Sequence, residues 1–461
     1  MDLSNIVRSD AKLDTRQKAS IALRLSAPAM MAQISSIAMQ YIDAAMVGRL
    51  GADASASIGL VAAIVWLMGG VTFAVAYGFS VQVAQGLGAG EEEHVRNVVL
   101  QGLVTLLLFS AAIGLVGAAL AGRIPYWLGG DASMAEDAGS YLRTYSLFMP
   151  AAQLMYYGSA VLQASGDTKT AGILEVLMCV EDVIFNALLI FPVEGEPYLP
   201  LGIGAGLGVT GAALGTCLSN LLTGLVMLYF IGVRSKALHF RRSDKYRLKK
   251  EIAWKAWEIG GPMAFESAAL SGAQVVSTAI VAPLGSVAVA AHSFAITAEA
   301  ICYMPGYGLE GSATTLVGQS IGAGKKKLAK SFGWITIALG IGIMGLAGLV
   351  MYFLCPYVFA FLTPVKEVAA LGVRVLRIEL LAEPLFGASI VCAGALRGAG
   401  DTMIPAIMNL CSVWGVRLTL AAFLVRGFGL EGVWIAMAIE LSFRGIIFLI
   451  HFVRSRYLRE A

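Results

Sequence analysis

Long apolar stretches separated by short polar segments run along almost the whole chain. An α-helix needs about 20 consecutive apolar residues to cross a bilayer. The stretches of that kind predict twelve spans, at residues 24–48, 54–80, 95–122, 138–162, 170–192, 206–232, 256–282, 287–313, 328–354, 370–396, 403–424 and 430–453. The pattern therefore predicts an all-α integral membrane protein with twelve transmembrane helices.

The composition excludes an ordinary soluble protein. Hydrophobic residues make up 58% of the 461 residues and charged residues only 14%, whereas soluble domains are about a quarter charged. The net charge of +3 gives no reason to expect a nucleic-acid partner. The six cysteines are scattered without a CxxC pair, and we interpret them as small apolar side chains.

Basic residues predict the orientation in the membrane. The segment Val233–Lys250 carries eight Lys or Arg residues, and further basic clusters lie at the N-terminus, at 324–330 and at 453–460. All of them fall on one side if twelve helices alternate in direction. We expect the protein to lie in the inner (plasma) membrane. The positive-inside rule then places both termini and the central loop in the cytoplasm. The N-terminus lacks the layout of a secretory signal, so the first span is expected to be retained.

The two halves of the chain repeat each other in sequence. The segment LQASGDT at 162–168 matches LRGAGDT at 396–402, a shift of 234 residues. A later stretch matches at a shift of 221, because the first half carries about thirteen extra residues near EGEPYLPLGIGAG. Further matched pairs are Pro28 and Pro262, Gly51 and Gly285, Gln85 and Gln319, Pro150 and Pro384, and, after the change of register, Gly206 and Gly427.

Each half contains six predicted helices, an even number, so both halves start on the same side of the membrane. This is a parallel repeat, and it predicts two six-helix bundles that alternate access to a site between them. The predicted domains are an N-lobe at residues 1–232, a cytoplasmic basic linker at 233–255 and a C-lobe at 256–461.

Ionisable side chains inside membrane helices are costly and usually mark a transport pathway or a buried pair. In the first half, Asp43, Asp182 and Asn186 provide hard oxygen ligands, with Asp182 and Asn186 on one helix face. Thr216 adds a hydroxyl. We expect this group to couple transport to a proton or to a sodium ion, with Asp43, Asp182 and Asn186 as possible Na⁺ ligands. The alternative is that these carboxylates are structural and hydrogen-bonded to nearby backbone.

In the second half, Glu266, Glu310 and Glu383 are candidates for substrate binding or for a second coupling site. Glu383 directly precedes Pro384, where the backbone ladder can open. Other intramembrane polar residues are interpreted as structural: Glu440 and Arg444 as an i,i+4 pair, Arg417 as the partner of an acid in its own bundle, His292 as a packing residue, and Glu175 and Glu181 as acids on other faces of their helix.

The glycine-rich turns GLGAG and SIGAG do not contain the GxxxxGK[ST] pattern of a phosphate-binding loop, and the chain contains no HExxH or kinase-type motif. Gln85 and Gln319 are expected to cap or cross-link helix ends, and Asp167 and Asp401 belong to the repeated GDT motif. The chain is therefore predicted to be a non-enzyme without a cofactor, apart from Na⁺ or H⁺ as coupling ion.

At these motifs the chain resembles the bacterial type of the MATE family, the multidrug and toxic compound extrusion transporters. The motifs that carry the resemblance are VGRLG at 47–51, VAQGLGAG at 83–90, LQASGDT at 162–168, ATTLVGQSIGAG at 313–324 and ALRGAGDT at 395–402. The resemblance implies a V-shaped molecule of two six-helix lobes.

The resemblance also implies antiport of a cationic or amphiphilic substrate against sodium ions or protons. The cation site of the relatives maps onto Asp43, Asp182, Asn186 and Thr216, although many relatives have the asparagine first and the acid or asparagine four residues later. Glu266 and Glu383 each lie about one turn from the acidic positions found in some relatives.

The function expected from these observations is efflux of organic cations or amphiphilic drugs by a protein that acts as a monomer in the lipid bilayer. A flippase for lipid-linked saccharides remains an alternative, although such a cargo favours several basic residues in the cavity. An integral-membrane transferase is a third class, for which the four histidines are too dispersed.

Overall fold

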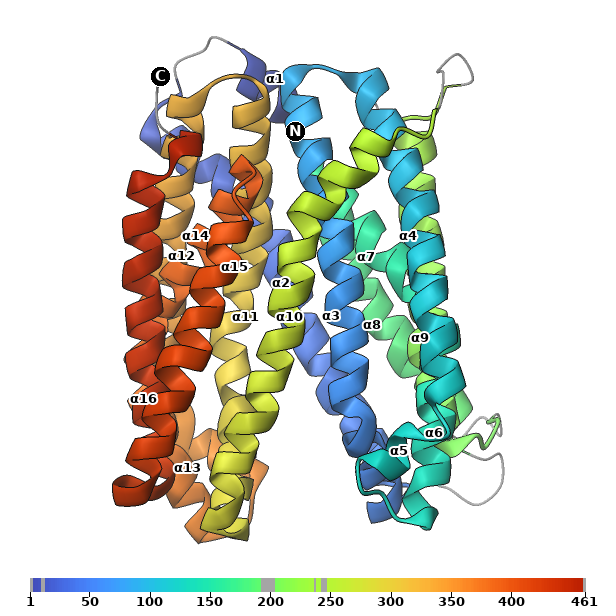
Figure 1. Ribbon diagram of the computed structural model, residues 1–461, viewed down its shortest axis with the longest axis vertical. Helices are drawn as coiled ribbons and strands as arrows, with labels where there is room; N and C mark the ends of the chain where they lie inside the picture. The colour runs from blue at the N-terminus through green and yellow to red at the C-terminus, as the bar shows by residue number, and fades with distance from the viewer. Residues whose placement is uncertain (1–2, 10–12, 192–203, 236–237, 242–246, 459–461) are drawn as a thin grey trace. The chain divides into compact units, whose positions relative to one another are not determined.

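The computed structural model describes residues 3–9, 13–191, 204–235, 238–241 and 247–458, and it is built from helices (Figure 1). The first half contains α1 (Leu3–Arg8), α2 (Thr15–Gly48), α3 (Ala52–Ala89), α4 (Glu92–Leu120), α5 (Ile124–Trp127), α6 (Ala132–Leu147), α7 (Met149–Ala164), α8 (Thr168–Ile190), α9 (Gly208–Tyr229) and the π-helix η1 (Phe230–Arg234). The second half contains α10 (Lys250–Val281), η2 (Ala282–Leu284), α11 (Ser286–Gly322), α12 (Lys326–Leu362), α13 (Lys366–Glu379), α14 (Glu383–Ala399), α15 (Met403–Leu410), the π-helix η3 (Cys411–Leu418), α16 (Thr419–Arg454) and η4 (Arg456–Leu458).

Eight described helical segments are long and apolar enough to cross a membrane by themselves. The last of them, Met403–Arg454, contains non-helical backbone at Gly429 and therefore corresponds to two of the predicted spans. The remaining predicted spans are α8, which carries three acids, and the helix pairs α6–α7 and α13–α14, whose members are individually too short. The described helices thus account for the twelve predicted membrane segments.

Proline breaks the two helix pairs at equivalent places. Pro150 is the second residue of α7 and Pro384 the second residue of α14. Proline lacks an amide hydrogen, so it is tolerated in the first turn of a helix but interrupts a continuous one. The predicted spans 138–162 and 370–396 are therefore each divided into two helices, where the sequence pattern predicted one continuous helix. Both divisions lie at the same place in the repeat.

The repeat is visible in the backbone as well as in the sequence. Left-handed glycines end or begin helices at the same positions in both halves, because only glycine adopts a positive φ without steric strain. Three pairs follow the shift of 234 and the fourth follows the shift of 221: Gly51 and Gly285 (φ 121° and 92°), Gly90 and Gly324 (81° and 71°), Gly166 and Gly400 (88° and 98°), and Gly208 and Gly429 (53° and 57°). Most of the thirteen extra residues near EGEPYLPLGIGAG, at 192–203, lie outside the described residues.

Packing groups the chain into two compact units. Unit 1 comprises Met1–Ile34, Ala84–Gly90 and Phe265–Ala461, and unit 2 comprises Ser35–Val83 and Glu91–Ala264. The long helices α2, α3 and α10 therefore each contribute residues to both units, whereas the predicted lobes, 1–232 and 256–461, follow chain order. In the predicted linker 233–255, residues 236–237 and 242–246 lie outside the described residues.

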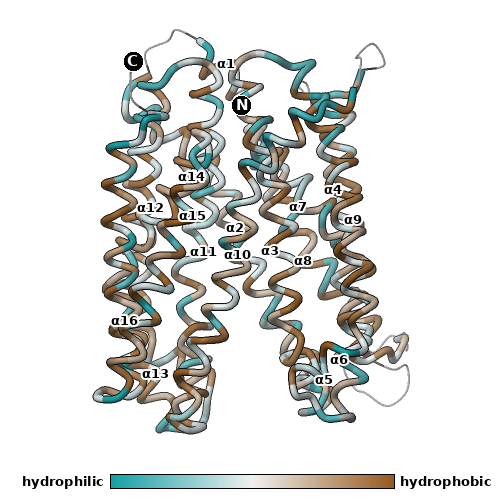
Figure 2. Tube along the Cα trace, viewed as in Figure 1, coloured by the Kyte–Doolittle hydropathy of each residue, from teal (hydrophilic) through white to brown (hydrophobic). Residues whose placement is uncertain are grey.

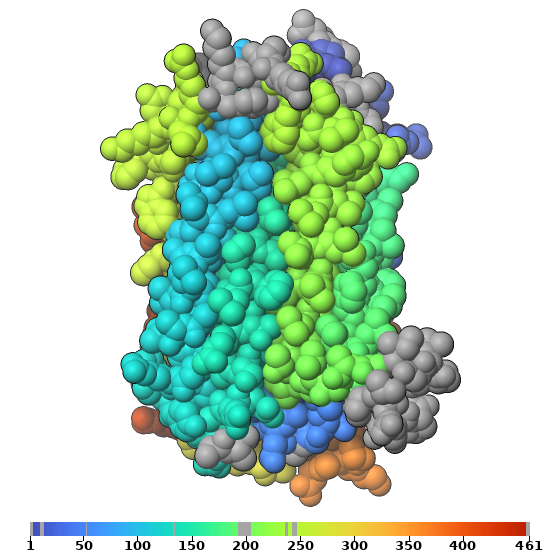
Figure 3. Space-filling model, turned by 90° about the vertical axis from the view of Figure 1, so that its right-hand side faces the viewer, coloured from blue at the N-terminus to red at the C-terminus, as the bar shows by residue number. Residues whose placement is uncertain are grey.

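Large apolar side chains cover the outer surface of the helices. Figure 2 shows hydrophobic residues along α4 and α12, with hydrophilic residues toward their ends. On the face of unit 2 in Figure 3, α4, α6 and α9 lie side by side. Leu108 and Leu115 of α4 are 69% and 65% exposed, and Leu225 of α9 is 51% exposed. Such a surface is suited to contact with lipid rather than with water, because the hydrocarbon core of the bilayer is itself apolar.

Inside unit 1, glycines let α3 and α11 cross at close range. A Cβ on Gly88 would overlap the backbone of Gln319, and a Cβ on Gly322 would overlap the backbone of Gln85. The two contacts are equivalent under the 234-residue repeat, so the crossing is symmetric. Small residues allow two helix backbones to approach closely, and membrane helices associate largely through such close packing. The Gln85 side chain also donates a hydrogen bond to the Gly398 carbonyl (3.1 Å), as expected of a residue that cross-links helix ends.

We predict that Gly322→Ala destabilises the protein by about 1–3 kcal/mol, because its methyl group has no space against the Gln85 backbone. Gly342→Ala is the matched control, since nothing lies within 4 Å of the Cβ that it would add to α12. Thermal unfolding of both variants in detergent measures the difference. Equal unfolding temperatures for Gly322→Ala and wild type would contradict the proposed close crossing.

Candidate functional site

The residues predicted as sites lie mainly in two groups of buried polar residues in the described membrane segments, one in each unit. The group in unit 2 contains Asp43 from the last part of α2, Asp182 and Asn186 from α8, and Thr216 and Ser219 from α9. We call it the Asp43 cluster. It contains all four residues predicted as the ion-coupling site, and packing of α8 on α9 brings Thr216 and Ser219 to Asp182.

The amide of Asn186 joins the two aspartates. Its Nδ2 donates to Asp43 Oδ1 (2.8 Å) and to Asp182 Oδ2 (3.0 Å). The Ser219 hydroxyl lies 3.3 Å from Asp182 Oδ1. Asp182 and Asn186 are 0% and 1% exposed, whereas Asp43 is half-buried. Two carboxyl groups so close together behave as one titrating pair.

A small residue opposite Asn186 makes this arrangement possible. A Cβ on Gly215 of α9 would overlap Asn186 Oδ1, so glycine at this position lets α9 approach the amide. Within the described residues, Asn186 Oδ1 has no hydrogen-bond partner. A half-turn of the amide would present Oδ1 to the aspartates in place of Nδ2, because an amide offers a donor on one side and an acceptor on the other. The cluster can therefore serve either a shared proton or an oxygen-liganded cation.

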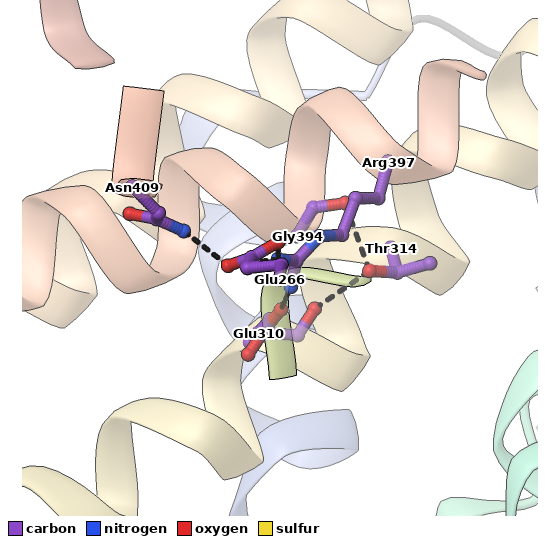
Figure 4. Close-up of polar contacts among 6 residues, drawn as sticks. All are labelled: Glu266, Glu310, Thr314, Gly394, Arg397 and Asn409. Carbon is purple, nitrogen blue, oxygen red and sulfur yellow. Dashed lines mark hydrogen bonds and ion pairs between the residues drawn. The ribbon is translucent and has the colours of Figure 1, made fainter. Parts of the chain in front are cut away.

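The group in unit 1 surrounds Arg397 of α14 and is shown in Figure 4. Arg397 Nη2 binds both carboxylate oxygens of Glu266 (3.2 and 3.0 Å), and Nη1 binds Glu310. Asn409 of α15 also donates to Glu266. The Thr314 hydroxyl donates to the Gly394 carbonyl (2.8 Å), which ties α11 to α14 beside the ion pairs. We call Glu266, Glu310, Arg397 and Asn409 the Arg397 cluster.

The structure therefore brings together two of the three acids predicted as a substrate or second coupling site, but it places Glu383 elsewhere. Glu266 and Glu310 share the guanidinium group of Arg397, so each carboxylate lies beside a positive charge. Glu383 lies instead near Glu299 and Glu379. Sequence reasoning missed Arg397 and Asn409, although Arg397 replaces Gln163 in the repeated motif, which was a usable signal.

Glu440 and His292 have the kind of partners that the sequence suggested. Glu440 is paired with Arg444 (3.0 Å) and with Arg417 (2.8 Å), and it accepts a hydrogen bond from Ser412 (2.6 Å). His292 accepts a hydrogen bond from Trp434 Nε1 (3.1 Å). These contacts hold α11, η3 and α16 together.

The two GDT motifs have different partners. Asp167 accepts a hydrogen bond from the Thr170 amide (3.2 Å) and so caps the N-terminus of α8. Asp401 instead pairs with His451 of α16 (2.8 Å). Gln319 is fully buried, where its backbone forms the surface against which Gly88 packs.

We predict that Arg397→Gln destabilises the protein by about 3–5 kcal/mol, because it leaves Glu266 and Glu310 buried without a positive charge. Adding Glu266→Gln and Glu310→Gln to the same variant is expected to restore most of the loss. Thermal unfolding in detergent measures both effects.

The matched control is Arg374→Gln, which breaks the exposed pair with Glu431 (3.2 Å). It is expected to cost less than about 1 kcal/mol, because solvent screens exposed ion pairs. A loss in Arg397→Gln no larger than in this control would contradict the role given to Arg397.

Comparison with known proteins identifies the family. A family model described as MatE matches residues 28–188 and 262–423. The two matched segments begin 234 residues apart, which is the register of the internal repeat. The match covers well over half of the chain.

Curated relatives match over nearly the full length. The "Probable multidrug resistance protein NorM" of Thermotoga maritima is 27% identical, with 95% of this chain and 93% of the relative covered. The protein of the same name from Brucella suis is 30% identical, with 94% and 92% covered.

Solved structures share the fold. A crystal structure of MATE in complex with MaL6 has a TM-score of 0.90 at 20% identity and covers 99% of both chains. A transporter of the MOP superfamily from Pyrococcus furiosus has a TM-score of 0.89 at 19% identity, with 100% of this chain and 99% of that chain covered. For that transporter, the reverse polarity of the binding pocket suggests a different function. The sequence and structure matches agree, and this multi-pass membrane protein belongs to the MatE family of transporters.

Proposed function

We propose that this protein is a secondary active antiporter that exports organic cations or amphiphilic drugs in exchange for a proton or Na⁺ bound at the Asp43 cluster. The observation that carries the proposal is the junction of Asp43 and Asp182 through Asn186 inside a membrane segment. The curated relatives are named multidrug resistance proteins, which supports drugs as the cargo.

The electrostatics of the Asp43 cluster explain why it would bind an ion. A carboxylate within a membrane segment costs about 2.5–3.5 kcal/mol or more. Two of them side by side also repel each other, and a proton or cation between them removes both penalties. The arrangement found here, with Asn186 donating to both carboxyls, supports the proton-loaded form, because a cation would require amide oxygen on that side.

Coupling requires that the ion bind two conformations unequally. In the proposed cycle, the two six-helix bundles alternate access, and loading of the Asp43 cluster changes the balance between the two states. In this proposal the protein lies in the inner membrane with both termini in the cytoplasm and acts as a monomer. It has no enzymatic activity and no resident cofactor, because the coupling ion is cargo.

The alternative function is flipping of lipid-linked saccharides across the membrane. A pyrophosphate headgroup favours several basic side chains that are available to bind it. In the described part of the chain, Arg397, Arg417 and Arg444 are instead paired with glutamates. This pairing supports export of cationic or amphiphilic molecules over a pyrophosphate-linked cargo.

We predict that Asp43→Asn lowers ion-coupled efflux at least about tenfold, because it removes the ionisable partner of Asp182. The measurement is efflux of a fluorescent organic cation from vesicles that contain the purified protein. A proton gradient and a sodium gradient are imposed separately. The gradient that drives efflux in the wild type identifies the coupling ion.

The matched control is Glu181→Gln. Glu181 is the neighbour of Asp182 on α8, but its carboxylate accepts a hydrogen bond from Thr223 (3.2 Å) outside the Asp43 cluster. This variant is expected to retain efflux. Normal efflux in Asp43→Asn would move coupling away from the Asp43 cluster, and absence of efflux from the wild type under both gradients would reject the proposed cargo.

A further inference from the structure

The repeated glycine turns carry opposite charges in the two halves of the chain. Three glutamates, at 91–93, follow the turn at Gly90, whereas three lysines, at 325–327, follow the turn at Gly324. These positions match under the shift of 234 residues, and both glycines have the same left-handed backbone (φ 81° and 71°). The turn therefore accepts either charge, and its geometry does not explain the lysines of the second half.

The basic charge continues along the first turns of α12, next to an exposed tryptophan. Helical periodicity places Lys326, Lys330 and Trp334 within about 80° of one another on one face of the helix. Trp334 is 40% exposed, and its ring packs against the ring of Phe452 of α16, with centroids 5.3 Å apart. Tryptophan is enriched at the boundary between lipid and water, so this face of α12 is suited to the membrane surface.

The end of α16 brings two arginines to the same place. α12 begins at the end of unit 1 where α16 finishes (Figure 1), and the Phe452 ring lies against Gly333 of α12. Counted from this contact toward the ends of the two helices, Lys330 lies at the level of the segment Arg454–Arg456. The short helix η4, which begins at Arg456, also packs on α12. We call Lys330, Trp334, Arg454 and Arg456 the Trp334 site.

The Trp334 site has a positive charge that no neighbouring acid in the sequence offsets. The segments 324–334 and 448–458 contain no Asp or Glu. The three basic side chains of the site form no ion pair with any residue that the structure describes. Asp401, in the turn between α14 and α15, is already paired with His451 (2.8 Å). The site is therefore suited to bind an anion.

An exposed apolar strip adjoins the arginines on the side of the membrane interior. Phe443, Ile446, Ile450 and Val453 of α16 are 43%, 49%, 47% and 50% exposed. Their spacing of three or four residues places them on one face of the helix, with Arg454 at the end of that face. A ligand that fits this place has an anionic head for the basic side chains and apolar chains for the strip. A soluble anion matches only the first of these features.

We propose that the Trp334 site binds the headgroup of an anionic phospholipid, whose acyl chains lie along the apolar strip of α16. Arginine and lysine donate charge-assisted hydrogen bonds to phosphate oxygens, and basic positions between membrane helices are typical binding places for such headgroups. The positive-inside rule requires an excess of basic residues on one side of the membrane, but not their combination with a tryptophan and an apolar strip. The proposal does not depend on the cargo or on the coupling ion.

The test is native mass spectrometry of the purified full-length protein with increasing amounts of phosphatidylglycerol. We expect the wild type to bind a first phosphatidylglycerol more tightly than phosphatidylcholine with the same acyl chains, because the phosphatidylcholine headgroup has no net charge. In Lys330→Gln/Arg454→Gln/Arg456→Gln, the affinity for the first phosphatidylglycerol should fall at least about tenfold, since each basic side chain near an anionic lipid surface contributes roughly fivefold. The affinity for phosphatidylcholine should not change. Circular dichroism and gel filtration check that the variant folds.

The matched control is Lys366→Gln/Arg374→Gln/Arg426→Gln, which removes three positive charges from exposed positions near the other end of unit 1. It should bind phosphatidylglycerol as tightly as the wild type. Equal weakening in the two triple variants would overturn the proposal, because net charge rather than the Trp334 site would then attract the lipid. Displacement of phosphatidylglycerol by water-soluble glycerol phosphate would also overturn it, because the site would then bind a soluble anion.

A second variant tests the site without removing any of its four residues. Lys326→Glu/Lys327→Glu gives the turn after Gly324 the charges that the equivalent turn after Gly90 already accommodates. We expect this variant to fold and to bind phosphatidylglycerol at least about fivefold more weakly, because the new carboxylates repel the headgroup. Unchanged affinity for phosphatidylglycerol in the folded variant would contradict the proposal.

Discussion

The cost of placing a charge in a hydrocarbon layer governs how the polar residues of this protein are arranged. Each ionisable side chain in a membrane helix has to be paired, shared or neutralised. Glu440 is satisfied by two arginines and a serine hydroxyl, and Glu266 by Arg397 and Asn409. Among the described residues, the Asp43 cluster contains no arginine, and its aspartates have the Asn186 amide and hydroxyl groups as neutral hydrogen-bond partners. That difference separates residues that hold helices together from residues suited to bind an ion.

Close helix packing makes these arrangements possible. Polar side chains can meet only where backbones approach, and glycine provides the space at several of the sites. Gly215 accommodates the Asn186 amide, Gly394 lies against Glu310, and Gly348 accommodates Glu383. A methyl group at any of these positions would move a carboxyl group or a helix. The high glycine content of the chain is thus linked to the polar sites as well as to the helix crossings.

The two halves share a backbone plan but differ in chemistry. Left-handed glycines and helix-breaking prolines recur at the repeat spacing, whereas the polar clusters do not. Arg397 has Gln163 as its counterpart, and Asp43 has Ser277. Backbone positions are fixed by the steric needs of turns, which are the same in both halves. Side chains that bind ions are free to diverge, and each unit has therefore acquired a different polar interior.

The sequence by itself determined the membrane class, the twelve spans, the parallel repeat and the family resemblance, because apolar length, glycine turns and prolines are local signals. It also determined that Asp182 and Asn186 share a face, since that follows from helical periodicity. Only the tertiary structure decided that Arg397 joins Glu266 to Glu310, and that Glu383 lies with Glu299 and Glu379. These contacts join helices distant in sequence, and their partners depend on how helices rotate and pack, which no local pattern encodes.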